Sequence, residues 1–193
     1  MKNAGKIAKH IITFIVFLLC GLFIFRCCIA GDQSVLKSLT VTDTLREAYA
    51  WNPDLEMLTH EMPFELSEDG YLSGYALVMI PSIAETQITL RYNDSIFSYN
   101  DLPEDATFTY RLTDSVTGAE VVGEVLASQD KWMYNYRRVI FDGLSWTEEN
   151  NLTVSLWCGE TKITELLLHH VDMNVVNEPY KLSRADKNAL TGN

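Results

Sequence analysis

Residues 11–25 read IITFIVFLLCGLFIF, and this run decides how the rest of the chain is organised. It carries no charged side chain and consists almost entirely of bulky apolar residues. The residues before it are few and basic, and the residues after Gly31 are acidic and patterned like strands. The sequence therefore predicts three parts, which are a short N-terminal stub, a membrane element and a globular domain.

The apolar run becomes long enough to cross a bilayer when it is extended to residues 7–30. A helix needs about 20 residues to span a hydrocarbon core that is roughly 30 Å thick. Basic residues precede the run without any acidic residue, at Lys2, Lys6 and Lys9. Because positive charge favours the cytoplasmic side, we predict a single-pass signal anchor in the cell membrane. Its stub, residues 1–6, would be cytoplasmic and the following domain extracytoplasmic.

A cleaved signal peptide is the alternative interpretation of the same segment. The basic residues would form its first region, the apolar run its second, and Cys28-Ile29-Ala30 a small-x-small cleavage site. Both interpretations export the same domain. A buried core helix is a third interpretation, and it is disfavoured because nothing later in the sequence offers a helical partner.

The charge of the chain is divided unevenly. Residues 1–31 hold four basic and no acidic side chains, so of the formal net charge of −11 the remainder carries −15. That remainder has the length of one ordinary domain with its own core. An acidic domain repels phosphate backbones and anionic lipid, so we expect no nucleic-acid partner.

The cysteines predict a fold held together by its core alone. Of the four cysteines, only Cys158 lies in the domain, so no disulfide can form within it. Cys158 continues an apolar alternation along residues 152–158, and we interpret it as a buried thiol.

A helix signal opens the domain after a tether at 31–42. Residues 44–47, Thr-Leu-Arg-Glu, have the form of a capping box. The Asn52-Pro53 pair can end one helix and begin another. We expect one or two short helices within residues 43–60, packed against a later sheet.

From residue 63 the apolar pattern changes from the period of a helix to the alternation of strands. Phe108, Tyr110 and Leu112 alternate with polar residues and predict the clearest half-buried strand. Turn signals separate about eight strands in all. The sequence thus predicts a mainly β protein, with an antiparallel β-sandwich of immunoglobulin-like or jelly-roll type over residues 43–176, or else a barrel. Residues 177–193 read as a polar C-terminal tail, in which residues 183–190 could form a brief helix.

An aromatic row is the candidate ligand-binding feature. Trp132, Tyr134 and Tyr136 occupy alternate positions of a predicted strand, and Arg138 continues their face. Such a row can stack on sugar rings, but it can equally be part of the core. A regular strand would bury Arg138 or expose Val139, so we predict a β-bulge between residues 136 and 138 that turns the aromatic row inward.

No motif for catalysis or metal binding is evident. Neighbouring histidines on a strand point to opposite faces, so His169, His170 and Asp172 do not predict a metal site. Two acidic groups are interpreted as solvated loops, namely Asp101, Glu104 and Asp105, and Glu148 with Glu149. We expect no cofactor and no catalytic residue.

Three functional hypotheses follow from these patterns. The first is a non-enzymatic, membrane-anchored extracytoplasmic domain that binds a protein partner or serves as an accessory of an envelope complex. The second is a carbohydrate-binding module that uses the aromatic row. The third is a hydrolase whose carboxylates converge only in three dimensions.

Overall fold

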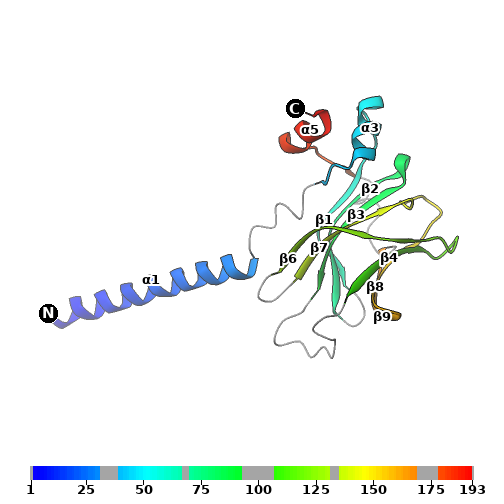
Figure 1. Ribbon diagram of the computed structural model, residues 1–193. Coiled ribbons are helices and arrows are strands. Elements are labelled where there is room, and N and C mark those ends of the chain that lie inside the picture. Colours follow the sequence, from blue (N-terminus) through cyan, green and yellow to red (C-terminus); the bar gives the residue numbers. More distant parts are fainter. Residues whose placement is uncertain are drawn as a thin grey trace.

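The computed structural model describes residues 2–30, 39–66, 70–92, 107–130, 135–168 and 178–192. Within these ranges, an apolar N-terminal helix is followed by two packed antiparallel sheets (Figure 1). The six-stranded sheet has the order β10-β1-β2-β3-β7-β6 and the four-stranded sheet the order β5-β4-β8-β9. The expected architecture of packed antiparallel sheets is confirmed.

The larger sheet contains β1 (Leu58–Leu66), β2 (Leu72–Ile80), β3 (Glu85–Tyr92), β6 (Glu124–Asp130), β7 (Asn135–Asp142) and the two-residue β10 (Glu178–Pro179). The smaller sheet contains β4 (Phe108–Asp114), β5 (Glu120–Val122), β8 (Leu152–Cys158) and β9 (Thr161–Leu167). The helical elements are α1 (Lys2–Ala30), α3 (Asp43–Trp51), α5 (Arg184–Thr191) and the short η1 (Pro81–Ile83).

Helix α1 contains a segment that is long and apolar enough to cross a membrane. This segment is Gly5–Phe25, 21 residues long, and none of its most apolar window is buried against the rest of the described structure. An uncovered apolar surface of this length is the property expected of a membrane span. A signal sequence near an N-terminus has the same property, so the structure supports a membrane or signal helix.

The main core lies between the two sheets. Leu77, Ile88 and Phe141 project into it from the larger sheet, and Tyr110 and Leu112 from the smaller one. Tyr110 and Leu112 are buried as the sequence predicts, while Phe108 is only half-buried near the end of β4. The half-exposed neighbours Thr109 and Arg111 lie on the other face of the strand.

A second, smaller core covers the outer face of the six-stranded sheet, which is the face turned away from the four-stranded sheet. Val78 and Ile80 of β2 contribute to it, together with Leu45 of α3 and Leu190 of α5. Helices α3 and α5 lie near each other at one end of this face (Figure 1). Strand β2 is therefore buried on both faces, as its apolar sequence predicts.

Helix α3 begins two residues earlier than its sequence suggests. Its N-cap is Thr42, whose hydroxyl oxygen accepts a hydrogen bond from the N–H of Leu45, so the capping box predicted at Thr44 is wrong. Thr42 is the cap because its hydroxyl can also donate to Glu85 in the sheet. Of the one or two short helices expected within residues 43–60, one forms, and β1 begins at Leu58.

The brief helix indicated by residues 183–190 forms as α5 in the C-terminal segment. In α5, the Ser183 hydroxyl accepts from the N–H of Asp186, and the Asp186 carboxylate accepts from the N–H of Ser183. This reciprocal pair is a capping box with Asp in the place of the usual Glu. Leu190 is buried in the outer core, which explains why this otherwise polar helix packs against the domain.

The run of residues 120–130 is divided between the two sheets. Its first part, β5, pairs with β4, and its second part, β6, pairs with β7. Gly123 lies at the crossing, where a Cβ atom would be 2.4 Å from Cγ1 of Val139 and 2.6 Å from Cε1 of Phe141. Glycine is therefore required by the close approach of the chain to the core.

The bulge predicted in the aromatic strand is wrong. Over Asn135–Asp142 the pairing of β7 with β3 runs without a shift of register. The irregularity lies on the neighbouring strand, because Leu126 of β6 is an extra residue between Val125 and Ala127. Arg138 can remain on a regular strand because the outer face is also covered, so its side chain is buried rather than displaced to an edge.

Candidate functional site

A buried polar cluster on the outer sheet face joins the N-terminal tether to the domain. We call residues 39–42 the strap, because they lead from the tether across this face to α3. The polar joint is formed by two strap residues with β3 and β7, through the side chains or backbone of Thr40, Thr42, Glu85, Gln87, Thr89 and Arg138.

The alternation of β3 explains how its polar residues reach the joint. Ile88 and Leu90 point into the main core, so Gln87 and Thr89 point to the outer face. On the neighbouring strand, Arg138 is the register partner of Thr89. A strand that reads as half polar thus places its polar half beneath the strap.

Gln87 clamps the backbone of the strap. Its amide nitrogen donates to the carbonyl oxygen of Thr40 at 2.7 Å, and its amide oxygen accepts from the N–H of Thr40 at 3.0 Å. The same side chain is fully buried and also contacts Glu85 and Arg138. An extended segment usually finds this pair of partners in a neighbouring strand, and here a single side chain provides both.

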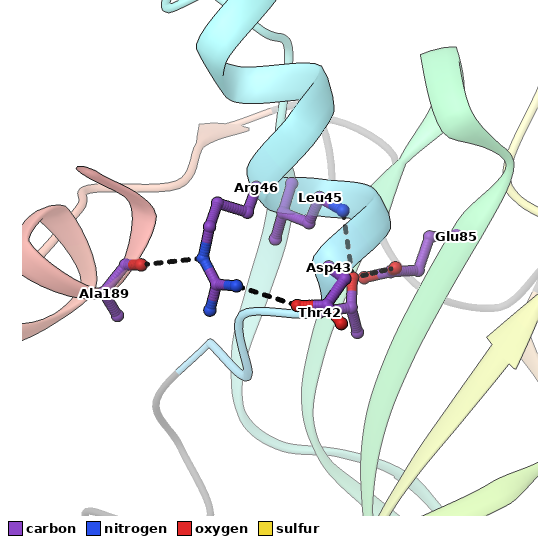
Figure 2. Close-up of polar contacts among 6 residues, drawn as sticks. All are labelled: Thr42, Asp43, Leu45, Arg46, Glu85 and Ala189. Carbon is purple, nitrogen blue, oxygen red and sulfur yellow. Dashed lines mark hydrogen bonds and ion pairs between the residues drawn. The ribbon is translucent and has the colours of Figure 1, made fainter. Parts of the chain in front are cut away.

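Glu85 holds the beginning of α3. One of its carboxylate oxygens accepts from the Thr42 hydroxyl at 2.8 Å, and the other accepts from Gln87 at 2.7 Å. Figure 2 shows Thr42 between Glu85 and the N–H of Leu45. Burial raises the pKa of Glu85 above its ordinary value, although these two hydrogen bonds act in the opposite direction.

Arg138 is the cation at the floor of the joint, with 1% of its surface exposed. Its guanidinium donates to the hydroxyl of Thr89 at 3.0 Å and to the amide oxygen of Gln87 at 2.9 Å. Burial lowers the pKa of Arg138 to about 10, so the side chain still carries its charge at neutral pH. Attraction from nearby acidic groups, including Asp186 and Glu85, opposes this lowering.

The C-terminal segment holds the strap from the other side. The hydroxyl oxygen of Tyr180 accepts from the N–H of Leu39 at 3.1 Å, and its O–H donates to the carboxylate of Asp186 at 3.0 Å. The N–H of Tyr180 donates to the carbonyl of Met57 at 2.7 Å. Burial raises the pKa of Tyr180 to about 12, which keeps this hydroxyl protonated well above neutral pH.

Arg46 ties the two covering helices together. Its guanidinium donates to the carbonyl oxygen of Ala189 in α5 at 3.3 Å and to the carboxylate of Asp43 at 2.7 Å (Figure 2). These contacts are exposed, so they contribute less to stability than those of the polar joint. The strap, α3 and α5 are nevertheless connected as one cover.

Of the aromatic row singled out in the sequence, the structure describes Tyr136 and Arg138. Tyr136 is 2% exposed and packs edge-on against Tyr75, with ring centroids 5.5 Å apart. Arg138 lies on the same buried face, in the polar joint. Trp132 and Tyr134 lie outside the described residues, so the aromatic row as a whole stays a prediction.

The other polar groups named from the sequence lie outside the described residues or on the surface. His169, His170 and Asp172 fall in the first class, as do Asp101, Glu104 and Asp105. Glu148 and Glu149 are exposed, and Cys158 is half-buried rather than buried. In the part of the chain that the structure describes, no three His, Cys, Asp or Glu side chains are grouped as metal ligands would be.

Sequence reasoning missed the polar joint because it assigned residues 31–42 to a tether. One signal was present. Leu39 and Val41 are apolar and alternate with Thr40 and Thr42, which is the pattern of an extended segment with one buried face. The structure buries Leu39 in the outer core.

These features define a domain of two packed antiparallel sheets that follows an N-terminal apolar helix in the chain, with residues 39–42 fixed to the outer sheet face. No protein-family model, no curated protein and no solved structure matches this chain significantly.

Proposed function

We propose that this protein is a non-enzymatic, membrane-anchored extracytoplasmic β-sandwich that binds a protein partner or serves as an accessory of an envelope complex. The observation that carries this proposal is the way the apolar helix is joined to the domain. The chain passes from α1 to the strap, and the strap is held by buried side chains of the sheet. In this proposal, the strap is the point at which the domain is attached to its anchor.

The orientation rests on charge. The basic stub before the apolar run favours a cytoplasmic N-terminus, and this places the domain outside. We infer that α1 remains attached as a single span, because its apolar segment Gly5–Phe25 is long enough to cross a bilayer. The immunoglobulin-like or jelly-roll connectivity expected from the sequence is part of this proposal.

Binding of a protein is favoured by exposed apolar side chains outside α1. Trp51 at the end of α3 is exposed, and so are Val122 and Val125, which flank the strand crossing at Gly123. Exposed aromatic side chains are typical anchors of protein interfaces. For the carbohydrate hypothesis, the two described members of the aromatic row, Tyr136 and Arg138, are buried, so their surfaces do not support stacking on a sugar ring.

Cross-linking of the full-length chain in intact cells tests this proposal. An impermeant amine-reactive reagent can reach exposed lysines such as Lys162. We expect a discrete complex of higher mass that contains a second protein and survives extraction in mild detergent. A chain that remains monomeric both after cross-linking in cells and after extraction in mild detergent would contradict the proposal. Binding to a glycan array that is lost in Trp132→Ala would support the carbohydrate hypothesis instead.

A further inference from the structure

Trp51 is the most exposed large apolar side chain outside α1 among the described residues, at 90% exposure. The geometry of α3 explains this exposure. Leu45 is the buried residue of the helix and faces the sheet. Because each helical residue turns by about 100°, Trp51 lies roughly 240° around the axis from Leu45. The helix therefore presents the indole to solvent.

Two exposed carboxylates lie close to Trp51 in the sequence, one on each side. Glu47 precedes Trp51 by one helical turn and lies on the same face. Asp54 follows the helix in a turn that is fixed by a 3.2 Å hydrogen bond from its N–H to the side chain of Asn52. Glu47 and Asp54 are both exposed. The cation of the helix, Arg46, is occupied by Asp43 and Ala189, so the surface near Trp51 is acidic.

The same chain shows what such a pair of groups can hold. On the four-stranded sheet, the guanidinium of Arg111 lies 4.3 Å from the centre of the Trp157 ring and forms an ion pair of 3.1 Å with Glu120. An indole and a carboxylate together bind one cation there. Helix α3 presents the same two groups, in Trp51 and Glu47, to the outside.

We propose that Trp51, Glu47 and Asp54 form a docking surface for a basic side chain, arginine or lysine, of a partner protein. This inference rests on the proposed function, since it names where the partner binds and what chemistry it offers. The partner's cation stacks on the indole, and the flanking carboxylates neutralise its charge. Arginine suits this surface best, because its planar guanidinium can stack on the indole and donate hydrogen bonds to both carboxylates at once.

The acidity of the surface favours a protein over the membrane as its occupant. An exposed indole can also enter a lipid headgroup layer. However, Glu47, Asp54 and Glu56 are exposed beside it, and anionic lipid repels such a group. A basic surface on a partner protein would instead be attracted by these carboxylates.

Site-specific photo-cross-linking in intact cells tests the docking surface. A photoreactive phenylalanine analogue replaces Trp51 in the full-length chain, and the matched control carries it at Val116, which is 60% exposed on the turn after β4. The Trp51 probe is combined with Glu47→Gln and Asp54→Asn, and membranes are also irradiated at low and high salt. We expect one protein adduct from position 51, at least fivefold weaker after neutralisation and weaker at high salt. The adduct should be absent from position 116.

Four outcomes would overturn this inference. They are no protein adduct at position 51, the same adduct at position 116, an adduct unaffected by neutralisation and salt, and contact with lipid. Lipid contact is measured by tryptophan fluorescence of the protein in phosphatidylcholine vesicles. The emission spectrum of Trp51→Phe is subtracted from that of the wild type, which leaves the emission of Trp51. Contact of Trp51 with lipid would shift this difference spectrum to shorter wavelength. If the amine-cross-linked complex persists in Trp51→Ala, the docking surface is wrong while the proposed function stands. If neither complex forms, both fail.

Discussion

Replacing Gln87 by alanine tests whether the polar joint holds the tether to the domain. The substitution removes an amide that contacts Thr40, Glu85 and Arg138. The polar groups that bonded to this amide stay under the strap without it. The side chain is fully buried, so the loss is not screened by bulk water. We expect the strap to loosen before the rest of the domain unfolds.

The structure sets the size of the effect. Two of the lost hydrogen bonds involve a charged group, Glu85 or Arg138, and such bonds contribute about 1.5–3 kcal/mol each. The two bonds to the backbone of Thr40 are neutral and contribute roughly 0.5–1.5 kcal/mol each. Because water can enter the vacated space and bond some of these groups, we expect a net loss of about 3–6 kcal/mol in the free energy of unfolding.

Urea unfolding of the full-length chain in mild detergent measures this loss, followed by tryptophan fluorescence. Gln129→Ala on the edge strand β6 is the matched control, because it removes the same side chain from a half-exposed position. Hydrogen exchange of the Thr40 amide gives a local readout, since its N–H donates to Gln87. A loss below about 1 kcal/mol with unchanged protection of that amide would refute the role of Gln87.

Three further predictions concern the sheets. Gly123→Ala should cost about 1–3 kcal/mol in thermal unfolding, because its Cβ would meet Val139 and Phe141; unchanged stability would show that the strand crossing can shift freely. Leu112→Ala should cost about 2–5 kcal/mol in a denaturant melt, and an effect as small as that of the control Thr109→Ala would contradict its place in the core. The Thr117 hydroxyl, with the N–H groups of Val116 and Asn151, holds the pKa of Asp114 below its usual value, so its stabilisation should be present above about pH 4 and lost as the pH falls through the lowered pKa. Asp114→Asn should therefore be less stable than wild type at neutral pH and lose less on acidification, and parallel pH profiles of the two proteins would contradict this.

Period and turn signals were sufficient to predict the two-sheet β architecture. Strand β8 lies at the predicted residues, and the turn after Asp114 lies where its polar and glycine residues indicate. These features depend on neighbours in the sequence, so a local pattern can reveal them. The division of residues 120–130 between two sheets depends instead on the approach of Gly123 to Val139 and Phe141, which no local pattern contains.

The polar joint was hidden for a similar reason. The sequence favours a bulge between residues 136 and 138 because it shows no partner for a buried Arg138. The sequence could not show that Gln87 and Thr89 lie across from it, or that the strap covers all three. The burial of Arg138 follows from contacts between β7, β3 and a segment that lies far away in the chain.

Labelling of a single cysteine in intact cells tests most directly the claim that an anchored domain lies outside the membrane. The full-length chain carries Val116→Cys in a background whose four native cysteines are serine. We predict that an impermeant maleimide labels this residue before the cells are opened, and that the labelled chain remains in the membrane pellet after a carbonate wash. Labelling only after lysis, or a labelled chain released in soluble form, would contradict the account.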